Sequence, residues 1–187
     1  VSDNKIQYLP GFAIILCDNK LNRRQLRRSR GGLRVLDPDA FASIVDIEKA
    51  PSDPVMKAKW MEALRDAGEI DGFVIPRGIY EGANLVSRRH SLLPDGQNEG
   101  DPDFLPPAYS DLIVLLARNR FPNSISKEIS EREGETCWWV QNTMLGSLDQ
   151  EMLEKIGVLV RHRQVRSLIK QAEATRDLTL EQVCLDP

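Results

Sequence analysis

The sequence predicts an α+β fold, and three observations support this class. Apolar runs bounded by turn-forming residues indicate buried strands. Other segments combine capping residues with apolar side chains at helical spacing, which indicates amphipathic helices. The 187 residues include 41% apolar and 28% charged residues, a composition typical of globular proteins that bury a core.

The first element is a strand, followed by an unusual basic segment. Residues 11–20, "GFAIILCDNK", form a continuous apolar run that ends in turn formers, as a buried strand does. Residues 20–34 then hold seven basic side chains and no acid. Arg23, Arg27, Arg30 and Arg34 recur at helical spacing, but Gly31 and Gly32 favour a helix end before the last of them. We therefore expect a short helix whose exposed face is almost entirely guanidinium.

Two helices are predicted next. In residues 37–50 an Asp can cap the start and apolar residues follow at helical intervals. Residues 51–68 give the strongest helical pattern, with Pro54 suited to the first turn and Gly68 to the exit. The predicted buried stripe of this helix comprises Met56, Trp60, Leu64 and Ala67.

The middle of the chain is predicted to contain strands and then a boundary. Residues 69–86 indicate two strands or a hairpin around Pro76 and Gly78. Residues 88–107 are rich in Pro, Gly and Asp, which is typical of a long loop or linker. The predicted domains are therefore an α/β unit with the Arg-rich segment (1–87), a linker (88–107) and a mainly helical unit (108–187).

Residues 108–187 suggest a series of helices. We expect a helix in 108–120, with a buried strand as the alternative, and another helix in 123–134. Residues 137–157 are predicted to be helical over their second half, with Cys137 and the neighbouring Trp pair in the core. Residues 158–174 allow either a strand followed by a helix or one continuous helix.

The phrases "SDLIVLLARNR", "SISKEISERE" and "LDQEMLEKIGVLVRHRQV" follow one another in this half. In this order they resemble the winged helix-turn-helix superfamily, whose members run three helices into a β-hairpin wing. A similar phrase, "LRDAGEIDGFVI", occurs in the first half, so the resemblance implies that the chain contains two small winged-helix-like units joined by a long loop. A generic α/β core is the alternative.

In that superfamily the third helix enters the major groove of DNA. Here the corresponding helix carries Asp149, Glu151 and Glu154, and these acids would repel phosphates. Base reading by this helix is therefore not expected. Arg161 and Arg163, in the implied wing, are expected to contact the phosphate backbone instead.

The basic segment is the main candidate for a function. With seven of the 25 basic residues here and all 28 acids elsewhere, it is a positively charged segment in an otherwise acidic chain. Arg outnumbers Lys in it, and guanidinium groups bind phosphate or carboxylate with paired hydrogen bonds. The predicted nucleic-acid-binding residues are Lys20, Arg23, Arg24, Arg27, Arg28, Arg30, Arg34, Lys57, Lys59, Arg161 and Arg163.

The sequence offers little support for catalysis. The two histidines, His90 and His162, have no cysteine at metal-ligand spacing, so neither a metal site nor a cofactor is expected. The acids Asp95, Glu99, Asp101 and Asp103 could gather a divalent cation, which leaves a metal-dependent nuclease as one alternative. The enzyme question stays open, with a non-enzymatic function favoured.

Three scattered cysteines favour a reducing compartment, cytoplasmic or nuclear. No apolar run has the length of a membrane span, so no membrane partner is expected. The chain begins with Val1, which suggests a domain of a larger protein.

The leading hypothesis is a non-enzymatic nucleic-acid-binding domain of an intracellular protein. The alternative from another class is a protein-interaction module that docks the basic segment on an acidic partner. The oligomeric state is not predicted.

Overall fold

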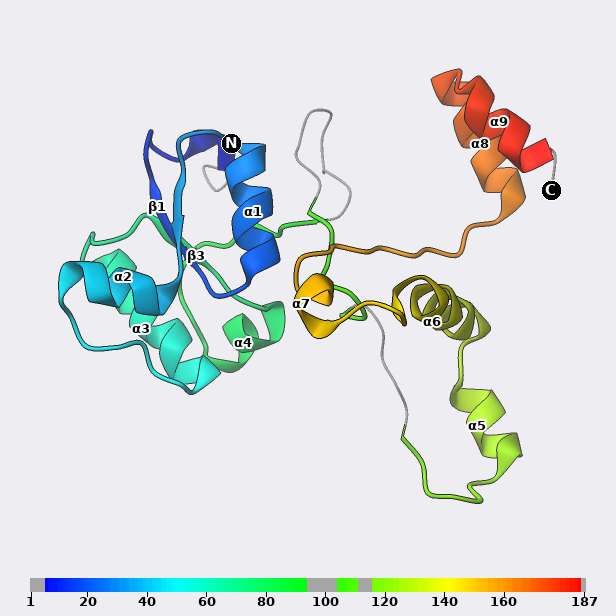
Figure 1. The fold of residues 1–187 in the computed structure, drawn as a ribbon, viewed down its shortest axis with the longest axis horizontal. Coiled ribbons are helices and arrows are strands. Elements are labelled where there is room, and N and C mark those ends of the chain that lie inside the picture. The colour runs from blue at the N-terminus through cyan, green and yellow to red at the C-terminus, as the bar shows by residue number, and fades with distance from the viewer. Residues whose placement is uncertain (1–5, 94–103, 111–115, 186–187) are drawn as a thin grey trace. The chain divides into compact units, whose positions relative to one another are not determined.

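The computed structural model describes residues 6–93, 104–110 and 116–185 (Figure 1). Helices and one small sheet make up these ranges, so the α+β class predicted from the sequence is confirmed. The chain forms two compact units. The first comprises Val1–Pro107 and Gln150–Gly157, and the second comprises Ala108–Asp149 and Val158–Pro187.

The sheet of the first unit is parallel. Strands β1 (Ile14–Cys17), β2 (Arg34–Leu36) and β3 (Gly72–Val74) lie in the order β2-β1-β3, with β1 in the centre. Leu16 of β1 pairs in register with Leu36 of β2 and Phe73 of β3. A parallel sheet is covered by helices on both faces, so its strands read as continuous apolar runs. This explains the apolar run around β1.

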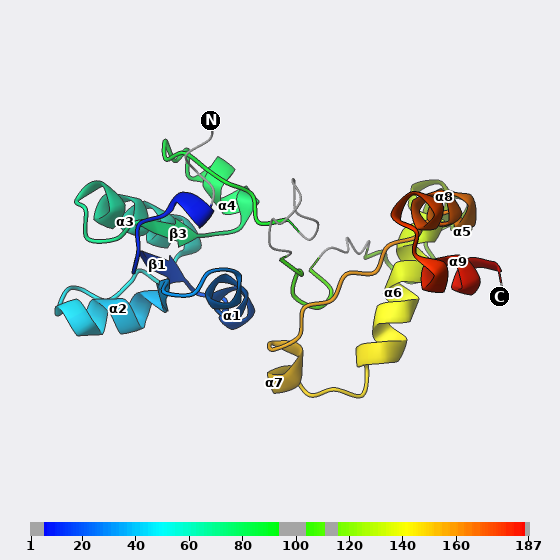
Figure 2. The same cartoon turned by 90° about the horizontal axis from the view of Figure 1, so that it is seen from above.

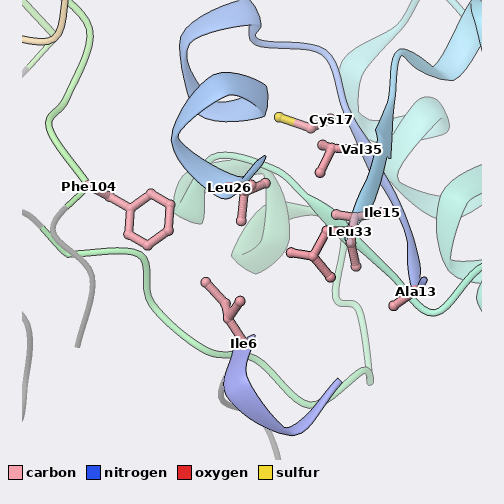
Figure 3. Packing of buried hydrophobic residues seen from close by; sticks show 8 residues of the cluster. All are labelled: Ile6, Ala13, Ile15, Cys17, Leu26, Leu33, Val35 and Phe104. Carbon is pink, nitrogen blue, oxygen red and sulfur yellow. The ribbon is translucent and has the colours of Figure 1, made fainter. Parts of the chain in front are cut away.

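One face of the sheet is covered by α1 (Lys20–Ser29), which connects β1 to β2. Ile15, Val35 and Leu26 pack together in the core on this side, together with Phe104 from the segment before the second unit (Figure 3). Ile6 of the short helix η1 (Ile6–Tyr8) joins the same cluster. Fully burying a side chain of this size contributes about 1.5–3 kcal/mol, so this core fixes α1 on the sheet.

The opposite face is covered by α2 (Pro38–Val45) and α3 (Pro54–Asp66). Leu16 packs there against Phe41 and Met61. In both Figures 1 and 2 the strands lie between α1 on one side and α2 with α3 on the other. The side chain of Asp53 caps α3 by accepting a 2.8 Å hydrogen bond from the backbone N–H of Met56, so the predicted helix in 51–68 is confirmed.

The predicted buried stripe of that helix is partly wrong. Met56 and Ala67 are exposed, whereas Ala58 and Met61 are buried. The reason is that α3 packs against two clusters: Met61 contacts the sheet, and Ala58 contacts the segment that follows α4 (Arg77–Gly82).

The hairpin predicted for 69–86 is also wrong. β3 pairs with β1 in parallel, and the residues after it form α4, which starts directly after Pro76. Proline restricts its own φ to a value compatible with a helix start and offers no N–H to a returning strand. The local pattern therefore could not distinguish a hairpin from a strand that leads into a helix.

The second unit is helical in its described part. Its helices are α5 (Asn123–Ile129), α6 (Arg132–Leu145), α8 (Val165–Thr175) and α9 (Leu178–Leu185). The helix expected in 123–134 therefore forms in its first part. The helix predicted over the second half of 137–157 is misplaced: α6 covers the first half and ends at Leu145, and of the remaining residues in this range only Gln150–Leu153 are helical. α8 and α9 pack against each other (Figure 1).

Cys137 of α6 is buried as predicted, but Trp138 and Trp139 are 47% and 63% exposed, so the prediction of a buried Trp pair is wrong. The buried face of α6 contains Cys137, Gln141 and Leu145 at helical spacing, and both Trp residues flank it. Residues 111–115, part of the helix expected in 108–120, lie outside the described ranges.

Residues 150–157 return to the first unit. They include α7 (Gln150–Leu153) and an isolated antiparallel bridge between Gly157 and Pro107. A Cβ atom at Gly157 would lie 2.6 Å from Cβ of Leu105, so only glycine fits this approach. Residues 158–164 belong to neither a strand nor a helix, and α8 begins only at Val165, so both alternatives predicted for 158–174 are wrong over the first seven residues. The winged-helix resemblance stays a prediction.

Candidate nucleic-acid interface

The basic segment forms α1 and the start of β2. The side chain of Asn19 caps α1 by accepting a 2.9 Å hydrogen bond from the backbone N–H of Asn22. The helix ends at Ser29 with Arg30 as its C-cap, and Gly32 continues the turn with φ of 91°, a conformation that favours glycine. The predicted helix with a glycine exit is therefore confirmed.

The exposed positions of α1 are all basic. We call them the basic face of α1, and they are Lys20, Arg24, Arg27 and Arg28. Leu21 and Leu26 are buried on the other side of the helix. Residues three and four positions apart lie on the same side of a helix, so the spacing of these cations and the burial of the two leucines gather them on one side.

The four side chains of the basic face differ in their contacts. Arg24 and Arg28, one helical turn apart, make no hydrogen bond or ion pair within the part of the chain that the structure describes. The guanidinium of Arg27 donates to the backbone carbonyl of Val35. Lys20 pairs with Glu154 at 3.3 Å, and both side chains are exposed. An exposed pair of this kind contributes about 0–1 kcal/mol, so Lys20 can exchange this partner for another anion.

Other predicted residues support the fold. Nη1 of Arg23 donates to the carbonyl of Cys17 at 2.6 Å and to the carbonyl of Asp18 at 2.7 Å. The same atom lies 2.9 Å from Oδ2 of Asp37, and the Arg23 side chain is only 15% exposed. Arg30 donates to the carbonyl of Ile6 at 2.6 Å. These guanidinium groups are thus committed to contacts that sequence spacing alone did not reveal.

The two lysines predicted on α3 differ in position. Nζ of Lys57 lies 2.9 Å from Oδ2 of Asp18, at the carboxyl end of β1. Lys59 is exposed on α3. Because α1 and α3 cover opposite faces of the sheet, the structure does not bring Lys59 together with the basic face.

Arg161 and Arg163 belong to the second unit. Nη1 of Arg163 donates to Oε1 of Gln171 at 2.8 Å, and Arg161 also takes part in an interaction. The proposed nuclease acids Asp95, Glu99, Asp101 and Asp103 lie outside the described residues. Among the residues that the structure describes, no group of three or more His, Cys, Asp or Glu side chains is arranged to hold a metal ion.

Sequence reasoning missed one feature of this region. Phe12 precedes β1, is 69% exposed and has a φ of 64°. The guanidinium carbon of Arg34 lies 5.8 Å from the centre of its ring. An aromatic residue directly after Gly11, at the start of a strand, was the only signal in the sequence.

Comparison of the chain with protein-family models, with curated proteins and with solved structures finds no match. Among the described residues, none of the helices has both the length and the apolar character needed to cross a membrane.

Proposed function

We propose that the first unit is a non-enzymatic module that binds the phosphate backbone of nucleic acids through the basic face of α1. One observation carries this proposal: every exposed position of α1 is basic, and Arg24 and Arg28 have no partner in the described part of the chain. Like charges one turn apart destabilise a helix by a few tenths of a kcal/mol. A bound polyanion would remove this repulsion.

The chemistry of the side chains favours phosphate. Guanidinium groups keep their charge at all physiological pH values and match phosphate oxygens with two parallel N–H donors. Contacts to the backbone carry no base information, and we propose no base-reading element. Binding is therefore expected to depend on salt and to vary little with sequence.

We further propose that this module works inside the cell as part of a larger protein. Cys17 and Cys137 are buried free thiols, which suits a reducing compartment. We also propose that Arg161 and Arg163 of the second unit bind phosphates, in addition to the contacts made by α1.

The test compares two double variants by fluorescence anisotropy with labelled duplex DNA, single-stranded DNA and RNA at several salt concentrations. R24A/R28A removes the two unpartnered charges without touching Arg23, which supports the fold. We expect weaker binding to duplex DNA and a slope of log K against log salt that is shallower by about 1.8, since each lost phosphate contact removes about 0.9.

The matched control is K49A/R88A, which removes the same charge elsewhere. Lys49 and Arg88 are exposed and have no ion pair in the described ranges. Arg88 follows Ser87, whose backbone N–H donates to Oε1 of Glu62 in α3. α3 lies on the side of the sheet away from α1. Unchanged binding by R24A/R28A, or equal losses in both variants, would overturn the proposal. If no probe binds at physiological salt while an acidic protein does, the basic face is a protein-docking surface.

A further inference from the structure

We infer that Phe12 is a stacking platform for an unpaired base, so that the first unit binds single-stranded nucleic acid more tightly than a duplex. This inference rests on the proposed function and names its substrate class. Three observations carry it: the backbone conformation of Phe12, the exposure of its ring, and the position of Phe12 and Arg34 at the edge of the sheet where α1 ends.

The backbone conformation of Phe12 is the first observation. The N–H of Ala13 donates to the carbonyl of Pro10 at 3.3 Å and closes a turn over Gly11 and Phe12. Phe12 has a φ of 64°, a region that glycine adopts freely and that strains a bulky side chain. The third position of such a turn is normally glycine. Strain of this kind concentrates at functional sites, and the Phe12 ring is in none of the apolar clusters that would explain the strain by packing.

The ring itself is the second observation. Phe12 is 69% exposed and belongs to none of the buried clusters of the sheet. The Arg34 guanidinium lies 5.8 Å from the ring centre, which is cation–π distance. This contact orients the ring and places a positive charge beside it. An aromatic ring next to a cation is the arrangement that single-strand binders use, because bases stack on the ring while phosphates pair with the cation.

The third observation is the position of this pair. The backbone N–H of Arg34 donates to the carbonyl of Ala13 at 2.9 Å, so Phe12 and Arg34 are held at the amino edge of the sheet. α1 starts at the carboxyl end of β1 and ends at this same edge (Figure 1). Its last turn carries Arg27 and Arg28. A backbone that follows the basic face can therefore present a base to Phe12, which a base paired within a duplex cannot reach.

The decisive variant is F12G, because glycine removes the ring and also relieves the strained backbone. We expect the melting temperature to be unchanged or higher, while affinity for single-stranded DNA falls roughly 5- to 160-fold, which is the usual stacking free energy expressed as an affinity ratio. Duplex affinity and the salt slope should not change. F12W should retain single-strand binding.

A second readout detects stacking directly. A single strand that carries a fluorescent adenine analogue should lose emission on binding to the wild type and to F12W, but not to F12G. Equal single-strand affinity and equal quenching for F12G and wild type would overturn the inference, as would a lower melting temperature of F12G, which would give the ring a structural role. In either case R24A/R28A still tests the basic face on duplex DNA, so the two proposals fail separately. If no probe binds, both are overturned.

Discussion

Nη1 of Arg23 and Oδ2 of Asp37 lie 2.9 Å apart and join the ends of the two neighbouring strands β1 and β2. The same nitrogen also donates to the two carbonyls at the end of β1. The other carboxylate oxygen of Asp37 accepts a 3.1 Å hydrogen bond from the N–H of Asp39 and caps α2. One ion pair thus connects β1, α1, β2 and α2 at the carboxyl edge of the sheet.

Arg23→Ala should destabilise the first unit by about 2–3 kcal/mol, because a hydrogen bond to a charged group contributes about 1.5–3 kcal/mol and the carbonyls of Cys17 and Asp18 lose their side-chain donor. Urea denaturation measures the change. Arg24→Ala serves as the control, since a substitution at an exposed position away from contacts stays within about 0.5 kcal/mol. Equal stability of the two variants would show that Arg23 has no structural role.

The two functions of Asp37 can be separated by substitution. Asp37→Asn keeps an oxygen for the cap of α2 but loses the negative charge opposite Arg23, whereas Asp37→Ala loses both. We expect Asp37→Ala to be less stable than Asp37→Asn by about 1 kcal/mol, the usual contribution of a helix cap. Urea denaturation of both variants tests this, and identical unfolding curves would contradict a capping role.

Glu62 should make stability depend on acid pH. Burial opposes its ionisation, but hydrogen bonds from Ser87 and Val86 and the charge of Arg65 outweigh this effect, so the pKa of Glu62 lies below its usual value of 4.5. Its contribution is complete above about pH 4.5 and disappears as the pH falls through the lowered pKa of the folded state. Glu62→Gln should therefore be less stable at neutral pH and lose less stability on acidification. Thermal unfolding from pH 7 to pH 3 checks this, and parallel curves for variant and wild type would refute it.

Cys17 should be inert in the folded protein. Burial raises the pKa of its thiol to about 11, despite the nearby charge of Arg23, and the thiolate is the reactive form. At pH 8 a thiol-specific disulfide reagent should modify the partly exposed Cys184 first and Cys17 only after unfolding in urea. Cys184→Ser should remove the fast phase of labelling. A fast phase that persists in this variant and disappears in Cys17→Ser would contradict the prediction.

Local signals predicted much of the first unit. The strand β1 followed from a continuous apolar run, and α1 and α3 followed from capping residues, spacing and glycine exits. Non-local pairing was out of reach. Nothing in residues 72–74 indicates that they align with β1 instead of folding back on their own neighbours, because the parallel partner lies far away in the sequence.

The candidate site shows the same limit. The charge of the basic segment and its helical exposure could be predicted from spacing, but the division of its arginines could not. Arg23 and Arg30 reach carbonyls of segments that precede them in the chain, whereas Arg24 remains on the exposed side. Which guanidinium is used by the fold depends on tertiary contacts, and so does the strained turn at Phe12.

Because residues 150–157 belong to the first unit, they constrain the order in which the two units can fold during synthesis. Gly157 packs against Leu105 and Leu21, so the layer around α1 is completed only after residues 108–149 have been synthesised. A nascent chain that stops before this point leaves the side of α1 with Leu21 open to solvent and to chaperones. Synthesis of the second unit therefore has to begin before the first can finish folding, although the first unit contains the amino terminus.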